Sequence, residues 1–337
     1  MKLDANVNFD QSAKANRTLQ LKSTGTIVAL LVAVYLGVPL VFGQDNYVMS
    51  MLVAALVIGG IALSWALLGN LGGMVSFGHA AFFGVGAYTS AIMSMKLGLP
   101  VLLAIPMGGV GAVLASLVML PVLRLKGPYF ALAILAYANI FRILATEWTS
   151  MTGGSGGLAS IPRLPQMMGI DFSSKTGSYL IILTIVLIFA GFYYLIRRSH
   201  YGLALRAMHE SEDATRVVGV NSTLLKGMML LVSAFMCGVT GAFNAHYINF
   251  LEPDYAFSGL WVTIPIVAAI FGGYRTITGP IVGAVVVYLI DQLVFKAIIP
   301  SGHQLVLGVL LVGMIVFSPD GLLDLARKLI RRNHAAT

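Results

Sequence analysis

Residues 47–68 read YVMSMLVAALVIGGIALSWALL, a run without a single charged side chain. A helix needs about 20 mostly apolar residues to cross the hydrocarbon core of a bilayer, so this stretch alone is long enough to span a membrane. Residues 69–89 follow directly, read GNLGGMVSFGHAAFFGVGAYT, and contain six glycines. Glycine is about 1 kcal/mol less favourable than alanine in a helix interior. The two stretches together predict a membrane helix followed by a broken or sharply bent one.

The composition of the whole chain agrees with this assignment. Of its 337 residues 58% are hydrophobic and only 10% are charged, whereas soluble domains carry about 45–50% apolar and about 25% charged residues. This deficit of charge excludes a water-facing surface around a single core. The one cysteine, Cys237, excludes an internal disulfide framework and a multi-cysteine metal site.

The same length criterion gives ten candidate spans, so the expected fold is an all-α polytopic membrane protein with about ten transmembrane helices, one of them glycine-broken or re-entrant. These spans occupy, in chain order, residues 26–42, 47–68, 77–95, 99–123, 129–146, 178–196, 226–247, 260–273, 279–295 and 304–318. The chain is thus expected to form a cytoplasmic N-terminal segment (1–25), a transmembrane domain (26–318) and a basic C-terminal tail (319–337).

The basic side chains indicate how this domain is oriented. The formal net charge is +8, but the lysines and arginines lie between apolar runs, where they set topology; no nucleic-acid partner is expected. With the N-terminus inside, 16 of the 21 lysines and arginines fall on the inner side, which predicts two cytoplasmic termini. The long loop 147–177 then lies outside and the long loop 197–225 inside. The tail 319–337 suits anionic lipid headgroups.

The inner loop contains the signals of a short helix. Ser211 is a typical N-cap, the acidic residues Glu212 and Asp213 suit the positive end of a helix dipole, and Gly219 is a typical helix stop. A helix this short is marginal in isolation, so something is expected to pack on its apolar face. Either a cytoplasmic partner protein docks there, or the segment lies on the lipid headgroups.

Polar residues inside the spans are candidates for a translocation path, because they are costly in a membrane. The alternative for each is an ordinary hydrogen bond between helices. The candidates are Asn70, Ser76 and His79 in and beside the glycine-rich stretch, Asn139 in the fifth span and Asp291 in the ninth. Asp291 is the clearest, and it leaves open an ion-coupled transporter in which this carboxylate carries a proton or sodium ion.

No phosphate-binding loop and no His-Glu-x-x-His metal motif occurs in the sequence. The chain is therefore expected to hold no catalytic residue, metal or cofactor, and any energy for uphill transport must come from another chain or from an ion gradient. A membrane-embedded transferase would need paired acids or a metal at one face, and only Glu210, Glu212 and Asp213 come close.

Four stretches carry a family resemblance. They are GMVSFGHAAFFGVGAY (73–88), GPYFAL (127–132), TGGSGGL (152–158) with Ile161-Pro162 after it, and SHYG (199–202) through GVN (219–221). In this order they resemble the permease subunits of branched-chain amino-acid ABC importers, of the LivM type. The resemblance implies an ABC importer permease fold in a bacterial inner membrane, and a branched-chain or related amino acid as substrate; similar permeases serve urea or short amides.

The resemblance also assigns a role to the inner loop. Asp213-Ala214-Thr215, followed after three residues by Gly219, is similar to the E-A-A-x-x-x-G core of the loop that docks into an ATPase subunit, although the Leu-Pro that follows in the general pattern is missing. The expected partners are two cytoplasmic ATPases that bind the ATP, a second homologous permease subunit and a periplasmic substrate-binding protein. The residues implied in coupling are Arg206, Glu212, Asp213, Ala214, Thr215, Arg216 and Gly219.

Overall fold

The computed structural model describes residues 32–125, 127–167, 169–300, 302–317 and 321 of the chain, which divides into two compact units after Met49. The first unit contains, from residue 32 onward, the π-helical turn η1 (Ala33–Gly37), the short helix α2 (Val38–Phe42) and the first residues of α3 (Asn46–Gly72). The second unit begins at Ser50 and holds the features described below.

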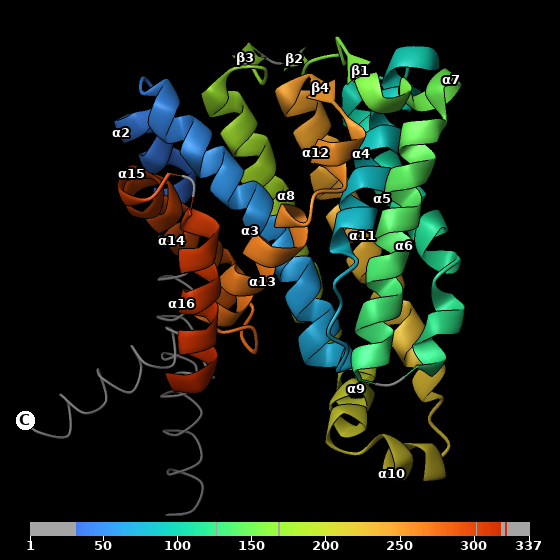
Figure 1. Cartoon of the computed structure of the whole chain (residues 1–337). Helices are drawn as coiled ribbons and strands as arrows, with labels where there is room; N and C mark the ends of the chain where they lie inside the picture. The colour runs from blue at the N-terminus through green and yellow to red at the C-terminus, as the bar shows by residue number, and fades with distance from the viewer. Residues whose placement is uncertain (1–31, 126, 168, 301, 318–320, 322–337) are drawn as a thin grey trace, which may run out of the picture. The chain divides into compact units, whose positions relative to one another are not determined.

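The second unit is built from long helices that run between two ends (Figure 1). After α3 these are α4 (His79–Lys96), α5 (Val101–Leu117), α6 (Pro128–Glu147), α8 (Lys175–Arg198), α11 (Ser222–Ile248), α13 (Leu260–Gly272), α14 (Gly279–Ile290) and α16 (His303–Phe317). The shorter helical segments are η2 (Leu120–Arg124), α7 (Thr149–Thr152), η3 (Gly154–Gly156), α9 (His200–Glu210), α10 (Glu212–Val217), α12 (Pro253–Ala256), η4 (Asp291–Phe295) and α15 (Lys296–Ile298).

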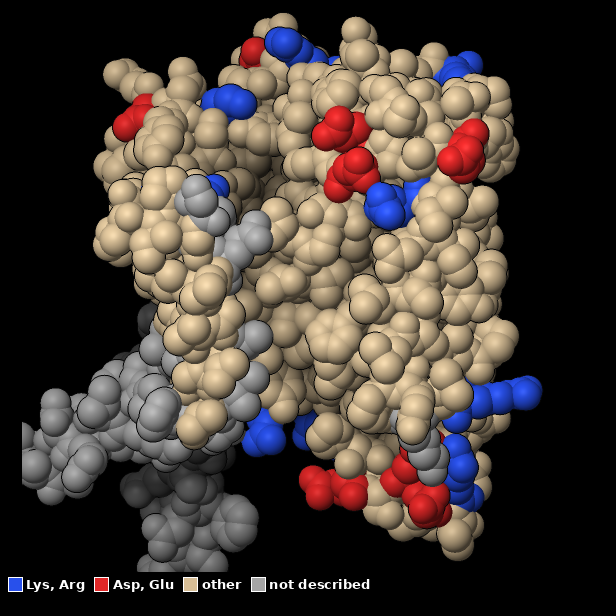
Figure 2. Space-filling view, viewed as in Figure 1, with Lys and Arg blue, Asp and Glu red and all other residues tan. Residues whose placement is uncertain are grey.

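Six helical segments within the described ranges are long and apolar enough to cross a membrane. They are Asn46–Gly72, Pro128–Glu147, Lys175–Arg198, Ser222–Ile248, Pro253–Gly272 and Gly279–Ile298. The all-α polytopic prediction is therefore confirmed, whereas the count of about ten spans stays a prediction. The segment 1–25 and all of the tail 319–337 except Gly321 lie outside the described residues. On the face seen in Figure 2, charged side chains gather toward the two ends and leave a broad uncharged band between them.

Two short strand pairs structure the loop 147–177 at one end of the bundle. Strand β1 (Leu158–Ala159) pairs antiparallel with β4 (Phe250–Leu251), which directly follows α11, and β2 (Gln166–Met167) pairs with β3 (Ile170–Asp171). The close approach of Gly157 to Leu251 permits the first pairing, because a Cβ atom on Gly157 would overlap the Leu251 backbone. The loop is thus fastened to the end of α11.

The helix break expected from the glycine-rich stretch is confirmed. Helix α3 ends at Gly72, α4 begins at His79, and Gly73 has a φ of +66°, a conformation that side-chain-bearing residues rarely adopt. The connecting backbone is held by the indole of Trp65, whose Nε1 donates to the Ser76 carbonyl oxygen at 2.9 Å. The break therefore turns the chain back as a fixed, hydrogen-bonded corner.

Helices α4, α5 and α11 pack with their backbones almost in contact. A Cβ atom on Gly86 of α4 would overlap the Gly238 backbone of α11, and one on Gly108 of α5 would lie 2.6 Å from the Ala242 methyl group of α11. Small residues allow this approach, which stabilises helix pairs in lipid through van der Waals contact. These three helices therefore form a closely packed group within the second unit.

The substitution Gly86→Ala is expected to destabilise the protein by about 1–3 kcal/mol, because the added methyl group forces two backbones apart. Gly191 of α8 is the matched control, since a Cβ atom there meets nothing within 4 Å, and Gly191→Ala is expected to stabilise by up to about 1 kcal/mol. Thermal unfolding of the purified protein in detergent measures both. Equal unfolding temperatures for Gly86→Ala and the unsubstituted protein would contradict this account of the packing.

Candidate functional site

The loop 197–225 forms two helices, α9 and α10, that project beyond the ends of the long helices (Figure 1). Ser199 caps α9 by accepting a hydrogen bond from the Gly202 amide at 3.3 Å, and Ser211 caps α10 by accepting one from the Ala214 amide at 3.3 Å. Gly219 follows α10 with a φ of +88°. The short helix predicted between Ser211 and Gly219 is therefore confirmed.

An ionic network fastens α10 to the start of α11. Glu212 accepts from Lys226 Nζ at 2.7 Å and from Arg216 Nη2 at 2.8 Å, and Arg216 Nε donates to Ser222 Oγ at 2.8 Å. The pKa of Glu212 is lowered from its ordinary value, mainly by the hydrogen bond from Lys226. A hydrogen bond from Ser222 and the positive charges of Lys226 and Arg216 lower it further, and together they outweigh the opposite effect of partial burial. Glu212 and Arg216 are both expected in ATPase coupling, and in the structure their side chains bind α10 to α11 of the same chain.

The remaining side chains of α10 and of Val218, which follows it, are of two kinds: one is buried and the others are exposed. Thr215 is buried and its hydroxyl donates to the Ser211 carbonyl oxygen at 2.7 Å. Four side chains remain exposed and form what we call the loop tip: Asp213, Ala214, Val217 and Val218. The two valines are 87% and 77% exposed. Neighbouring exposed apolar side chains of this kind mark surfaces that contact a protein or a membrane.

Arg206 and Asn70 meet at this same end of the bundle. Asn70 Nδ2 donates to Tyr193 Oη at 2.8 Å and to the Arg275 carbonyl oxygen at 3.2 Å. Both Asn70 and Arg206 line a cavity of about 560 Å³ beside α9, together with Arg197, Arg275, His209, Glu210 and Leu71. The structure therefore places Asn70, expected along the path, next to a residue expected in coupling.

Ser76 and His79 are buried among helices. His79 Nε2 lies 2.9 Å from Ser233 Oγ, whose own proton is donated to the Ser64 carbonyl oxygen at 2.9 Å, so His79 donates from Nε2. The thiol of Cys237 donates to the His79 carbonyl oxygen at 3.2 Å. These hydrogen bonds join α3, α4 and α11. For His79 the structure thus shows an ordinary hydrogen bond between helices, the alternative to a place along the translocation path.

Asn139 lies apart from the other candidates. Its side chain is exposed on α6, and its amide donates to the Leu135 carbonyl oxygen of the same helix at 3.2 Å. One helix turn away, Arg142 of α6 pairs with Asp254 of α12 at 2.9 Å. This face of α6 thus carries polar groups on a segment that is otherwise apolar enough to cross a membrane.

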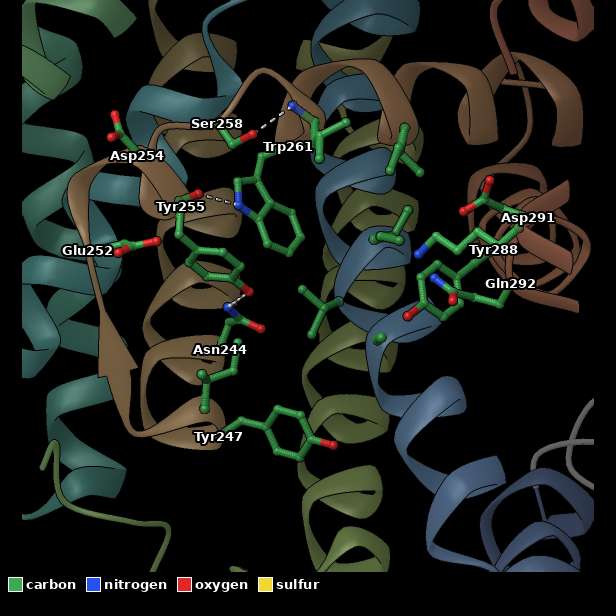
Figure 3. Close-up of a pocket in the computed structure, with 17 residues that line it drawn as sticks. Asn244, Tyr247, Glu252, Asp254, Tyr255, Ser258, Trp261, Tyr288, Asp291 and Gln292 are labelled. Atoms are coloured by element: carbon green, nitrogen blue, oxygen red, sulfur yellow. Dashed lines mark hydrogen bonds between the residues drawn. The ribbon is translucent and has the colours of Figure 1, made fainter. Parts of the chain in front are cut away.

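Asp291 lies in a cavity of about 590 Å³ between α3, α11, α12, α13 and the segment α14–η4–α15 (Figure 3). It opens the π-helical turn η4 and is 3% exposed, and its Oδ1 atom has no hydrogen-bond partner among the described residues. π-Helical turns within α-helices occur frequently at functional sites. Of the five candidate path residues, Asp291 is the one that the structure places in this cavity.

The wall opposite Asp291 is aromatic and internally hydrogen-bonded. Tyr255 accepts at Oη from Asn244 Nδ2 at 2.9 Å, and its carbonyl oxygen accepts from Trp261 Nε1 at 2.8 Å (Figure 3). The sequence pattern did not single out several residues of this cavity, namely Tyr247, Tyr255, Trp261, Tyr288, Gln292 and Lys296. Lys296 lies five residues after Asp291 in an otherwise apolar stretch. A second charged residue so close to Asp291 is the sequence feature that could have pointed to this part of the cavity.

The helical bundle with its six apolar segments long enough to cross a membrane, and the uncharged band between its ends (Figure 2), define a multi-pass helical membrane protein. Residues 47–315 match the family model described as "Branched-chain amino acid transport system / permease component", and the chain belongs to that family. No solved structure gives a significant match.

Three curated relatives illustrate the match. The chain is 29% identical to the high-affinity branched-chain amino acid transport system permease protein LivM of Salmonella typhimurium, over 77% of this chain and 65% of that protein, slightly under two thirds. It is 27% identical to the protein of the same name from Escherichia coli K12, over 92% of this chain and 77% of that one. It is 24% identical to the high-affinity branched-chain amino acid transport system permease protein LivH of Salmonella typhimurium, over 78% of this chain and 90% of that protein.

Acid is expected to loosen the loop through Glu212. Because the folded state lowers the pKa of this carboxylate from 4.5, its ionic network contributes fully above about pH 4.5 and is lost as the pH falls through the lower folded value. Hydrogen exchange of the α10 amides, corrected for intrinsic rates, is expected to show constant protection from about pH 7 to 5 and a loss below.

The variant Glu212→Gln is expected to remove this acid step and to leave weaker protection at neutral pH. Asp213→Asn, which neutralises an exposed carboxylate one residue away, serves as the control that keeps the step. An acid step of equal size in Glu212→Gln would show that the network does not hold α10.

Proposed function

We propose that this chain is a transmembrane permease subunit of an ATP-binding-cassette importer for branched-chain or related amino acids. The observation that carries the proposal is the family match over residues 47–315, because the permease description covers the loop, the cavity and the helices between them. The relatives named LivM and LivH are described as permease proteins of a high-affinity branched-chain amino acid transport system. The substrate class follows from those descriptions.

The proposal fixes an orientation. The loop tip faces the cytoplasm, the strand pairs face the periplasm, about ten helices cross the bacterial inner membrane, and both termini are cytoplasmic. Support comes from the basic residues near the loop, such as Arg197, Arg206 and Arg275, which favour the inner side. The basic tail then lies beside anionic membrane lipids.

The proposed function also implies partner proteins. Two ATPase subunits bind ATP in the cytoplasm, and one of them docks on the loop tip. A second, homologous permease subunit completes the membrane unit; the similarity of this chain to both LivM and LivH of Salmonella typhimurium supports such a pair. A periplasmic substrate-binding protein delivers the amino acid. We place no covalent chemistry and no cofactor in this chain.

The geometry suits alternating access driven from outside the chain. A force applied at the loop tip reaches α11 through the bonds from Glu212 to Lys226 and from Arg216 to Ser222. Helix α11 is packed closely against α4 and α5, and we infer that these helices move together. At its far end α11 carries Asn244 and Tyr247 into the wall of the cavity. Nucleotide-driven motion at one end is thus converted into a change of the cavity at the other.

The family match does not favour the two alternatives raised by the sequence. An ion-coupled transporter would use Asp291 as its carrier, and a permease of the same family could serve urea or short amides. The cavity walls are largely apolar and aromatic, which suits an aliphatic side chain better than urea.

The variant Ala214→Glu is expected to reduce ATPase association and ATP-driven leucine uptake by at least about tenfold. The reason is that the new carboxylate would be buried in the apolar contact between the loop tip and the ATPase. Ala214 is exposed in the chain itself, so insertion and folding are expected to be unchanged. Ala214→Ser is the matched control and is expected to retain association. Co-purification of the ATPases with tagged protein, and uptake by cells, measure the two effects. Normal association and uptake in Ala214→Glu would remove the docking role.

A further inference from the structure

We propose that the cavity around Asp291 is a binding subsite for a zwitterionic amino acid with an aliphatic side chain, in which Asp291 binds the α-ammonium group and Lys296 binds the α-carboxylate. The choice of an amino acid as ligand rests on the proposed function. The assignment of its two charged groups rests on the cavity itself, and neither the family description nor the relatives' names assign these residues.

Asp291 is positioned to bind a cationic group. Ionisable side chains are rare within membrane segments and mark substrate or ion pathways there. Asp291 is 97% buried, and its Oδ1 atom has no hydrogen-bond partner in the part of the chain that the structure describes. A buried carboxylate oxygen without a donor is strongly unfavourable. Because Asp291 lines the cavity, an ammonium group bound there can donate to this carboxylate after a small rotation of its side chain.

Lys296, the first residue of α15, lies on the same side of the continuous segment α14–η4–α15 as Asp291. The segment Asp291–Phe295 is π-helical, and in such a turn residues five apart follow one another along one face. Asp291 and Lys296 accordingly both line the cavity. No ion pair within 4.0 Å joins them among the described residues, so neither charge neutralises the other directly. An acid and a base held apart in one cavity match the two charged ends of an amino acid.

The rest of the cavity suits an aliphatic side chain. Its volume of about 590 Å³ is within the range of about 300–1,000 Å³ that is typical of small-molecule sites. In Figure 3, Tyr288, Asp291 and Gln292 lie on one side, and Asn244, Tyr255 and Trp261 lie on the other. Apolar and aromatic side chains complete the walls, among them Val57, Ile58, Ile264 and Leu260. A few polar groups set among apolar walls are the arrangement that orients such a ligand.

Two further carboxylates set the charge at the α12 end of the cavity. Glu252 and Asp254 both line it, and Asp254 is 82% exposed and paired with Arg142 at 2.9 Å. An acidic rim attracts an ammonium group and repels a ligand that carries only a carboxylate. The cavity is therefore expected to prefer the zwitterion over the corresponding carboxylic acid.

Protection of an introduced thiol tests the subsite. In a Cys237→Ala background, Ser258→Cys places a thiol at the cavity wall, and membrane vesicles that contain the assembled transporter are treated with a thiol-specific methanethiosulfonate. L-Leucine is expected to slow the labelling. Equal concentrations of 4-methylpentanoate, which lacks the ammonium group, or of 3-methylbutylamine, which lacks the carboxylate, are expected to protect at least about tenfold less effectively.

Neutralising variants assign the two ends of the ligand. Asp291→Asn and Lys296→Gln are each expected to raise the leucine concentration for half-protection by about ten- to a hundredfold. Asp291→Asn is also expected to remove the advantage of leucine over 4-methylpentanoate, and Lys296→Gln its advantage over 3-methylbutylamine. Glu147→Gln is the matched control, because Glu147 is exposed at the end of α6 and does not line the cavity. A second readout is the change in tryptophan fluorescence of the purified chain with leucine, which Trp261→Phe should remove.

The outcomes separate this subsite from the proposed function. Undiminished labelling in the presence of leucine, in vesicles that still take up leucine with ATP, would overturn the subsite and leave the transport role intact. Equal protection in Asp291→Asn and Glu147→Gln would overturn the role of Asp291. Protection without any ATP-driven leucine uptake would instead support the subsite and contradict the proposed function.

Discussion

The near-contact of the α4, α5 and α11 backbones is the constraint on which the rest of the second unit depends. It exists because Gly86, Gly108 and Gly238 present no side chain where the helices cross. In lipid there is little hydrophobic drive between helices, so close van der Waals contact must hold them together. With these helices fixed against each other, the two ends of α11 keep a defined relation: one end holds the inner loop through Lys226, and the other carries Asn244 into the cavity.

Polar groups within the bundle divide according to whether a neighbouring helix satisfies them. Ser233 and His79 are bonded to each other and to α3, and Tyr255 and Asn244 are bonded to each other. Such pairs stabilise helix contacts, although the second ring nitrogen of His79, Nδ1, has no partner among the described residues. Asp291 also has a buried oxygen without a donor, but unlike His79 it is a carboxylate that lines the cavity of Figure 3. The proposed ligand-binding role therefore rests on a carboxylate without a partner in the wall of a cavity, and not on polarity within a span alone.

Local signals in the sequence predicted local structure well. The glycines before residue 79 predicted the break after Gly72, and Ser211 with Gly219 predicted α10, because caps and left-handed turns depend on neighbouring residues. The helix α9 was not expected, although Ser199 caps it in the same manner.

Contacts between distant segments could not be predicted in this way. The cavity joins residues from α3 to α15, and no spacing along the chain indicates that Tyr255 and Trp261 face Asp291. For the same reason the placement of Asn70 beside Arg206, and of Asn139 on an exposed face, was not foreseeable. The polar type of these residues was visible in the sequence, whereas their neighbours depend on how the helices pack.

Under the proposed function, this chain moves its substrate only when a partner subunit hydrolyses ATP. Reconstitution of the purified chain in liposomes, with and without its second permease subunit, the ATPases and the binding protein, tests this most directly. The account predicts concentrative leucine uptake in the complete system with ATP, and none by the chain alone under a proton or sodium gradient. Gradient-driven accumulation by the solitary chain, abolished in Asp291→Asn, would contradict it.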